Sequence, residues 1–332
     1  MTEAAPWAEH ASTFTREFED VVSFFTQQTS KTVVSRVMKI AWPTVGTIVR
    51  RTVARRGTPL SQRKLRRLGV DEISYRRHHK YLTLVADHET GQVVWGGEGK
   101  SAQTLDGFFD ALGEEASKHV ELVSLDMSAA FIASIRRRLP HATVVFDPFH
   151  VVKLANEAVD KVRRAQVRAL AGAADSSALK KTRWILLKAP ENLRPEERYQ
   201  LSLIGKANRP LYRAYLLKEA LRAVYAARTG SAARRRLEDW LAWAHRSRLP
   251  PFVKLARTLR QHFEGIIAAV EHGLSNGRLE GLNSKVRLLS HRAFGFHSAD
   301  ALLALVHLCC SGIDVPLPSD QRPLAEPYAL IA

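Results

Sequence analysis

Two acidic residues lie within short apolar runs of the chain. Asp71 stands in the middle of the run from Leu68 to Ser74, and Asp126 ends the run that starts at Val120. Both runs have the length and apolar content of a buried strand. Burying an unpaired carboxylate costs several kcal/mol, so each acid must face solvent or a cation. Because neither acid serves packing, both are candidates for chemistry.

A third acid, Glu280, falls on a predicted helix far along the chain. The segment from Ser275 to Arg287 places apolar side chains along one stripe and polar ones on the adjacent flank. The stripe contains Leu279, Leu282, Val286 and Leu289, and the flank contains Asn276, Glu280, Asn283 and Arg287. This spacing predicts a helix with one buried side and with Glu280 along its edge.

Three carboxylates from two strands and a helix suit a site for Mg²⁺ or Mn²⁺. Such hard cations prefer oxygen ligands and are held by a few carboxylates together with water and substrate phosphates. Two ions about 4 Å apart can activate the attacking oxygen and stabilise the leaving oxygen of a phosphoryl displacement. Asp71 and Asp126 would form the core pair, and Glu280 would complete the site. The alternative is that three unrelated acids happen to lie near strand ends and on a helix face.

The charge of the chain predicts a polyanionic partner. Its 332 residues include 50 Lys and Arg against 33 Asp and Glu, a formal net charge of +17. Nucleic acid and an anionic membrane are the two candidates. No apolar run approaches the ~20 residues that a membrane span needs, and the N-terminus lacks the features of a signal peptide. We therefore expect a cytoplasmic, nucleoid-associated protein that binds double-stranded DNA and no membrane.

Residues 1–57 are predicted to form a helix-turn-helix module for DNA binding. One helix opens at Ser30, and Pro43 suits the first turn of the next. The apolar residues expected on one face of the first helix are Val33, Val37 and Ile40, and those facing inward from the second are Val45, Ile48 and Val49. The residues expected to face outward, toward DNA, are Thr44, Thr47, Arg50 and Arg51. The alternative is a small helical bundle with a solvated basic face.

The period of the pattern changes at residue 68 and predicts an α/β core interrupted by helices. A basic linker, 58–67, either tracks phosphates or is merely solvated. Strands are expected over 68–74, 81–86, 92–95, 120–126 and 142–146, with helices over about 104–116 and 129–139. Three strands followed by alternating helices and strands imply a mixed sheet with flanking helices. The predicted core comprises 68–155 and 271–313, the all-helical insertion 156–270, and an extended tail 314–332.

Most of the positive charge falls in the predicted insertion. Between residues 151 and 270 there are 25 Lys and Arg against 10 Asp and Glu, which is +15 of the total +17. Arg234, Arg235 and Arg236 precede Trp240 and Trp243. Arginines beside tryptophans at this spacing make either a DNA-contacting face or the edge of a helical core, so the three arginines are candidate DNA ligands.

Five motifs in order resemble the DDE transposases of bacterial insertion sequences, of the ISL3 type. They are Gly69-Val-Asp-Glu, Leu125-Asp-Met-Ser, Phe146-Asp-Pro-Phe-His-Val-Val-Lys153, the segment from Ser275 to Arg287, and Arg292-Ala-Phe-Gly-Phe296. The similarity runs from about Ser30 to Gly312. The resemblance implies a ribonuclease-H-like core with a helical insertion, and places Asp71, Asp126 and Glu280 on the family's metal-binding acids. It also implies cleavage at element ends and transfer of the 3′-hydroxyl into target DNA, by a homodimer or larger assembly.

Further residues lie near these acids in the motifs. Asp147 and His150 match an Asp/Cys-x-x-His motif that is similar in Mutator and hAT transposases. Capping of the next helix by Asp147, braced by His150, is at least as good an explanation as contact with metal or DNA. The polar residues that could touch DNA near Glu280, or be simply solvated, are Asn276, Arg278, Asn283 and Lys285.

The cysteines mark a departure from the family. Its members usually begin with a cysteine-rich zinc-binding module, whereas the first cysteines here are the adjacent pair Cys309 and Cys310. The chain is therefore expected to lack that module, and a catalytically inactive shortened copy that regulates by binding DNA is the alternative function. A junction resolvase is a further alternative, but such an enzyme has little need of a basic insertion or a helix-turn-helix.

Overall fold

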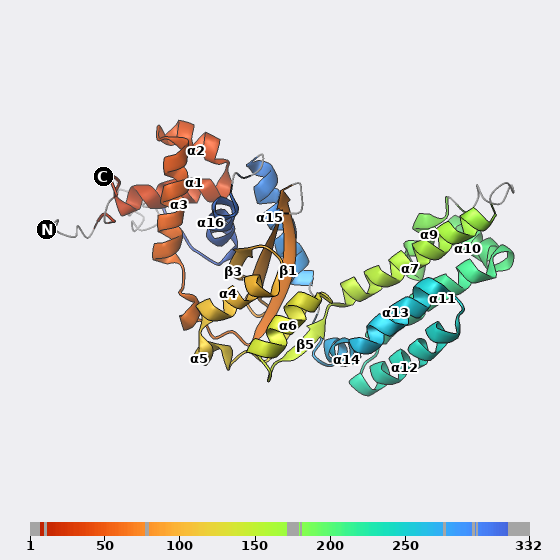
Figure 1. Ribbon diagram of the computed structural model, residues 1–332. Coiled ribbons are helices and arrows are strands. Elements are labelled where there is room, and N and C mark those ends of the chain that lie inside the picture. Colours follow the sequence, from red (N-terminus) through yellow and green to blue (C-terminus); the bar gives the residue numbers. More distant parts are fainter. Residues whose placement is uncertain are drawn as a thin grey trace, which may run out of the picture. The chain divides into compact units, whose positions relative to one another are not determined.

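The chain folds into two compact units, shown in a computed structural model in Figure 1. The structure describes residues 7–9, 12–76, 80–170, 179, 181–274, 277–293, 296 and 298–317. The first unit comprises Met1–Glu121, Ala129–Ala142 and Gly277–Ala332, and the second Leu122–Ser128 and Thr143–Asn276. The short segment that carries Asp126 thus belongs to the unit that contains the predicted insertion.

A five-stranded mixed sheet in the order β3-β2-β1-β4-β5 confirms the predicted α/β class. The strands are β1 (Arg67–Arg76), β2 (Lys80–Asp87), β3 (Val93–Glu98), β4 (Leu122–Leu125) and β5 (Thr143–Phe146). β1, β2 and β3 form an antiparallel meander in the first unit, and β4 and β5 pair in parallel in the second. Asp87 stabilises the turn between β2 and β3, because its carboxylate accepts hydrogen bonds from the backbone N–H groups of Glu89 and Thr90.

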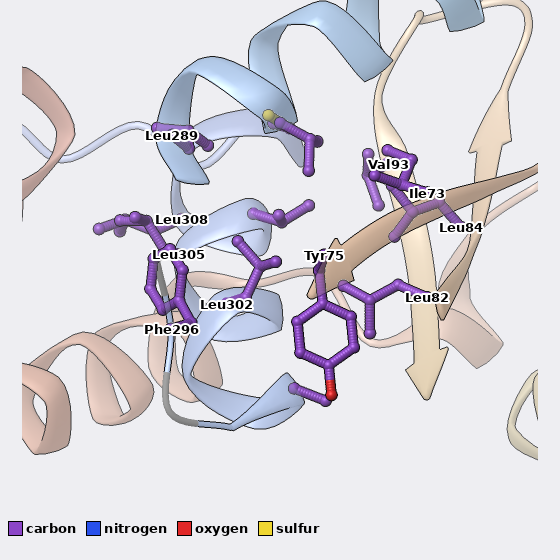
Figure 2. Close-up of a cluster of buried hydrophobic side chains, with 14 of the residues drawn as sticks. Ile73, Tyr75, Leu82, Leu84, Val93, Leu289, Phe296, Leu302, Leu305 and Leu308 are labelled. Atoms are coloured by element: carbon purple, nitrogen blue, oxygen red, sulfur yellow. The ribbon is translucent and has the colours of Figure 1, made fainter. Parts of the chain in front are cut away.

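Two C-terminal helices cover the meander and build the core of the first unit. They are α15 (Gly277–Arg292) and α16 (Ala299–Cys310). In Figure 2 the labelled side chains of the strands point toward those of the helices and of the segment that joins them. The strand residues are Ile73, Tyr75, Leu82, Leu84 and Val93, and their partners are Leu289, Phe296, Leu302, Leu305 and Leu308. Burying each such side chain is worth about 1.5–3 kcal/mol.

The approach of α15 to β1 is close at Gly69. A β-carbon added there would collide with the side chain of Leu279, which packs over the strand. Glycine therefore lets the helix lie directly on β1 and fixes its position along the strand. Because Leu279 and Glu280 are neighbours, Gly69 also helps to place the third predicted acid.

Three helices precede the sheet, as predicted for residues 1–57. They are α1 (Arg16–Gln28), α2 (Lys31–Met38) and α3 (Trp42–Arg56), and Ser30 caps α2 through a bond from the N–H of Val33. Val45, Ile48 and Val49 are buried, as expected. The prediction for α2 was wrong, because Val33 is 45% and Val37 is 63% exposed whereas Val34 is buried. The face of α2 that packs on α3 is instead made by Val34 and the stem of Lys31, whose amino group lies against Gly46.

The predicted linker is partly built into the first unit. It contains the short 3-10 helix η1 (Leu60–Gln62), after which Leu65 is buried and Arg66 pairs with Glu121 at 2.8 Å. The helix expected over 104–116 is divided at Gly113 into α4 (Ala102–Leu112) and α5 (Glu114–Ser117). Gly113 has a φ of 83°, which ends α4 at no steric cost. The expected helix over 129–139 is α6 (Ala129–Arg138).

Within its described residues, the second unit is helical beyond β5, as predicted. Its helices are α7 (Pro148–Ala169), α9 (Arg183–Leu187), η2 (Pro190–Asn192), α10 (Pro195–Ala207), α11 (Arg209–Tyr225), α12 (Gly230–Arg246), α13 (Pro250–Gln261) and α14 (Phe263–Glu271). α7 packs on α11 and α13, and α14 packs on β5. Proline or glycine opens α7, α10, α12 and α13, so local sequence sets where these helices begin.

The C-terminal helix α16 is buried, as its apolar sequence predicts. Cys310 lies in the core, and burial raises the pKa of its thiol to about 11, so the group is a neutral thiol at neutral pH. Of the predicted tail, residues 314–317 are described and Val315 is buried, while 318–332 lie outside the described residues. Among the described residues, no helix combines the length and apolar character that crossing a membrane requires.

Candidate active site and DNA-binding surfaces

Asp71 is held at mid-strand by two neutral donors. Its Oδ1 accepts a bond of 2.7 Å from the backbone N–H of Glu72, and its Oδ2 accepts one from the side-chain amide of Asn283. Asn283 is 7% exposed, so this bond lies at the edge of the core. Since an amide carries no net charge, the carboxylate is oriented while its own charge is kept. Both carboxylate oxygens of Asp71 thus accept hydrogen bonds, one from its own strand and one from α15.

Glu280 lies on the same helix as Asn283, one turn earlier. The helix packs on β1 through Leu279 at Gly69 and through Asn283 at Asp71, and between these two contacts the Glu280 side chain is exposed. Side chains three positions apart lie on one side of a helix. The predicted helix edge is confirmed, and it lies along the strand that carries Asp71.

In the second unit, Asp126 and Asp147 follow paired residues of the two parallel strands. Leu125 of β4 is in register with Phe146 of β5, and the N–H of Asp147 donates to the carbonyl of Leu125 at 3.3 Å. The two carboxylates thus leave the sheet at the same edge. Asp126 accepts a bond of 2.9 Å from the N–H of Ser128, which fixes the turn before α6.

Asp147 is used for structure, as the capping explanation predicts. It is 3% exposed, and its Oδ1 accepts a bond from the N–H of Phe149 at the start of α7. Its Oδ2 lies 3.0 Å from Nδ1 of His150. Burial, with the Asp147 charge as a smaller cause, raises the pKa of nearby Tyr225 well above its ordinary value. The surroundings of Asp147 are thus a helix cap, an imidazole and a neutral phenol.

The donor chemistry of the three predicted acids fits a hard divalent cation. Carboxylate oxygens, two of them already oriented at Asp71, are the ligands that Mg²⁺ and Mn²⁺ prefer. Within the part of the chain that the structure describes, no three His, Cys, Asp or Glu side chains are gathered closely enough to enclose a metal by themselves. A hard divalent cation that is held by few carboxylates takes its remaining ligands from water and substrate phosphates.

Two of the residues expected near DNA on α15 also hold the helix in place. Arg278 donates to the backbone carbonyl of His88 at 2.6 Å, which holds the β2–β3 turn. Lys285 donates to the carbonyl of Cys309 at 2.6 Å, at the end of α16. Arg287 is exposed, and Asn276 lies outside the described residues.

The outward residues of α3 divide into free and engaged side chains. Arg50 is exposed and donates to the hydroxyl of Thr47 at 3.2 Å, and it has no ion pair within the residues that the structure describes. Thr44 and Thr47 are half-buried. The expectation for Arg51 was wrong, because its guanidinium lies 2.5 Å from the fully buried carboxylate of Glu19. The buried acid draws Arg51 inward toward α1.

Arg234, Arg235 and Arg236 divide in the same way. Arg234 pairs with Glu264 at 2.7 Å, and Arg236 donates to the carbonyl of Ala223 at 2.7 Å. Arg235 and Arg236 are both exposed, and within the described residues neither has a carboxylate partner. Trp240 is buried and its indole N–H donates to the carbonyl of Leu217. Trp240 is therefore part of the helical core, and the prediction that these arginines contact DNA remains a prediction for Arg235 and Arg236, which are exposed.

Comparison with known proteins supplies independent information on activity. A family model described as "Transposase" matches residues 68–306. The chain is 41% identical to the transposase for insertion sequence element IS1557 of Mycobacterium tuberculosis, over 95% of this chain and 76% of the relative. It is 28% identical to the transposase for insertion sequence element IS1001 of Bordetella parapertussis, over 90% of this chain and 74% of the relative.

Proposed function

Because this chain belongs to the ISL3-type transposases, we propose that it is a metal-dependent enzyme that cleaves DNA at element ends and transfers the 3′-hydroxyl to target DNA. Asp71, Asp126 and Glu280 are its metal-binding acids, carried on a ribonuclease-H-like sheet. The bond from Asn283 to Asp71 is the observation that carries this proposal. It ties the helix of Glu280 to the strand of Asp71, although the two bonded residues are 212 positions apart.

The chain's own residues orient the acids for this role. Asn283 and the N–H of Glu72 fix the rotation of the Asp71 carboxylate, and the N–H of Ser128 fixes Asp126. A bound Mg²⁺ or Mn²⁺ would lower the cost of the charge that develops on the attacking and leaving oxygens. Since the acids come from both units, the proposal makes cleavage dependent on residues of each unit.

In the same proposal α2 and α3 are the helix-turn-helix. The turn between them is short, with Lys39 at a φ of 53° and with the hydroxyl of Ser35 donating to the carbonyl of Ile40 at 2.6 Å. A rigid turn of this kind can present the second helix to the major groove. Arg50 and Thr47 are its candidate contacts. Assembly as a homodimer or larger on DNA and a cytoplasmic location remain predictions.

We expect Arg50→Ala and Arg51→Ala to have different effects. Loss of Arg50 removes a phosphate contact, so the plot of log affinity against log salt concentration should become shallower by about 1. The melting temperature of this variant should be unchanged. Loss of Arg51 should lower the melting temperature, because buried Glu19 loses a partner, and should leave the slope of the folded protein unchanged. DNA binding across a salt series, with thermal melts of both variants, measures this. A lower slope and an unchanged melt for Arg51→Ala would instead assign Arg51 to DNA.

We expect Asn283→Ala to weaken metal use without weakening DNA binding. Outer partners of metal ligands are worth roughly 10–100-fold in metal affinity or activity. The cleavage rate should fall by that factor, and the Mg²⁺ concentration for half-maximal cleavage should rise. Ser284→Ala, which changes an exposed neighbour on α15, is the control and should have no effect. An unchanged metal requirement for Asn283→Ala would remove Asn283 from the site.

The direct test uses purified protein, Mg²⁺ or Mn²⁺, and a duplex that carries the ends of its own element. Strand nicks at the element boundary that require metal are the expected result. Binding of the duplex without nicks would favour a DNA-binding regulator. Preferential cutting of branched DNA over element ends would favour a junction resolvase.

A further inference from the structure

One stretch of the second unit is basic without any acidic residue. Between Asp239 and Glu264 the chain carries five Lys and Arg and no Asp or Glu. Helix α13 (Pro250–Gln261) lies in this stretch and contributes three of them, Lys254, Arg257 and Arg260. The stretch without acids covers the end of α12, the short connection after it and the whole of α13.

The three cations of α13 are exposed, and its apolar residues are buried. The buried residues are Phe252, Leu255, Ala256 and Leu259. At 100° per residue, Lys254 and Arg257 lie opposite this buried side and Arg260 lies on its flank. Within the described part of the chain, none of the three side chains forms an ion pair. They form a continuous positive surface, the α13 basic stripe.

Eight of the other cations of the unit have carboxylate partners among the described residues. Arg163 and Arg164 pair with Asp160, and Lys188 and Arg194 pair with Glu197. Arg222 and Arg234 also have carboxylate partners. Like charges three or four positions apart on a helix cost about 0.2–0.5 kcal/mol per pair. The α13 basic stripe bears this cost, and no ion pair within the described part of the chain offsets it.

From this we infer that the α13 basic stripe (Lys254, Arg257 and Arg260) binds the phosphate backbone of double-stranded DNA without reading its sequence. The inference rests on the proposed function, which makes DNA the polyanion. At 1.5 Å per residue the stripe spans about 9 Å, which matches roughly two to three phosphates at 3.4 Å along one strand. Basic side chains that have no competing acids can neutralise phosphates and so release counterions condensed on the DNA, and each contributes to the salt dependence of binding.

The test measures binding of the full chain to a labelled duplex of random sequence over a series of salt concentrations. For the triple variant Lys254→Ala/Arg257→Ala/Arg260→Ala, the plot of log affinity against log salt concentration should become shallower by about 2 to 3. The charge-conserving variant Lys254→Arg/Arg257→Lys/Arg260→Lys should keep the wild-type slope. Thermal melts check that both variants are folded, as expected for exposed residues.

A matched control removes the same charge elsewhere in the unit. Lys181, Lys206 and Arg209 are also exposed, and their triple Ala variant should keep most of the wild-type slope. An equal loss of slope in both triple variants would show a general effect of net charge and overturn the inference, as would an unchanged slope in the α13 variant. If the wild-type protein bound no DNA at all, the proposed function itself would fail, which distinguishes the two failures.

Discussion

Asp126→Asn is expected to abolish metal-dependent cleavage at the element boundary while DNA binding persists. The change removes one charged oxygen ligand and almost no volume, so the turn that the N–H of Ser128 fixes can be kept. A metal ion supplies several kcal/mol of transition-state stabilisation, and a loss of about 4 kcal/mol corresponds to roughly a thousandfold in rate. Removing a negative charge lowers the repulsion of the DNA phosphates, so binding should persist. Gel assays of nicking and binding on the same duplex measure both quantities.

Asp147→Asn is the matched control for this prediction. The two aspartates follow paired residues of β4 and β5, but Asp147 caps α7, and asparagine caps a helix about as well as aspartate. The cleavage rate of Asp147→Asn should therefore stay within roughly tenfold of wild type, because tenfold is the smaller effect seen when a residue beside a metal ligand is changed. Asp71→Asn and Glu280→Gln should match Asp126→Asn. Full activity in any of these three variants would remove that acid from the metal site.

The positions of the candidate acids along their elements could be predicted from the sequence. Apolar runs of strand length located β1 and β4, and a four-residue stripe located α15, because burial of one face fixes the period of the pattern. The helix starts at Ser30 and near Pro43 were also predicted, since caps and prolines act locally. Features that depend on residues close together in the sequence could therefore be predicted from it.

Contacts between residues far apart in the chain could not be predicted from the sequence. The bond between Asn283 and Asp71 depends on how α15 lies on β1, and periodicity does not say which strand a helix packs on. Arg51 has the same spacing as an outward residue, but a buried acid of another helix draws it inward. Val33 and Val37 were misplaced for a related reason, because the stem of Lys31 fills the position that a valine was expected to take.

The basic insertion shows the same limit in terms of charge. Counting residues locates the charge in 151–270, but pairing decides which cations remain free, and pairing is a property of the packed helices. Arg234 and Arg236 are engaged, although they stand in the densest run of arginines. The cations that remain exposed and unpaired, within the described residues, include those of α13, where no acid lies nearby in the sequence.

Glu19→Ala should have the largest effect on stability among the changes considered. The Glu19 carboxylate is fully buried and lies 2.5 Å from Arg51 and 3.3 Å from Arg55. Breaking a buried ion pair by removing one partner costs about 3–5 kcal/mol, because the remaining charge stays buried without compensation. Such a loss is a large part of the 5–15 kcal/mol that typically stabilises a domain. Urea unfolding followed by tryptophan fluorescence, to which Trp42 of α3 contributes, measures the change.

The control is Glu17→Ala, on the same helix but exposed, which should change the free energy of unfolding by no more than about 0.5 kcal/mol. Changing both partners, as in Glu19→Leu/Arg51→Met, should recover part of the loss relative to Glu19→Leu alone, because no unpaired charge then remains at that position. If the double variant were no more stable than Glu19→Leu, the ion pair would not be what holds α1 on α3.

Arg51, Arg55 and Arg56 all pair with acids of α1, so α3 keeps Arg50 alone for DNA among its four arginines. The first unit therefore uses most of the positive charge of α3 to hold itself together, which is why DNA affinity should depend on Arg50 and stability on Glu19.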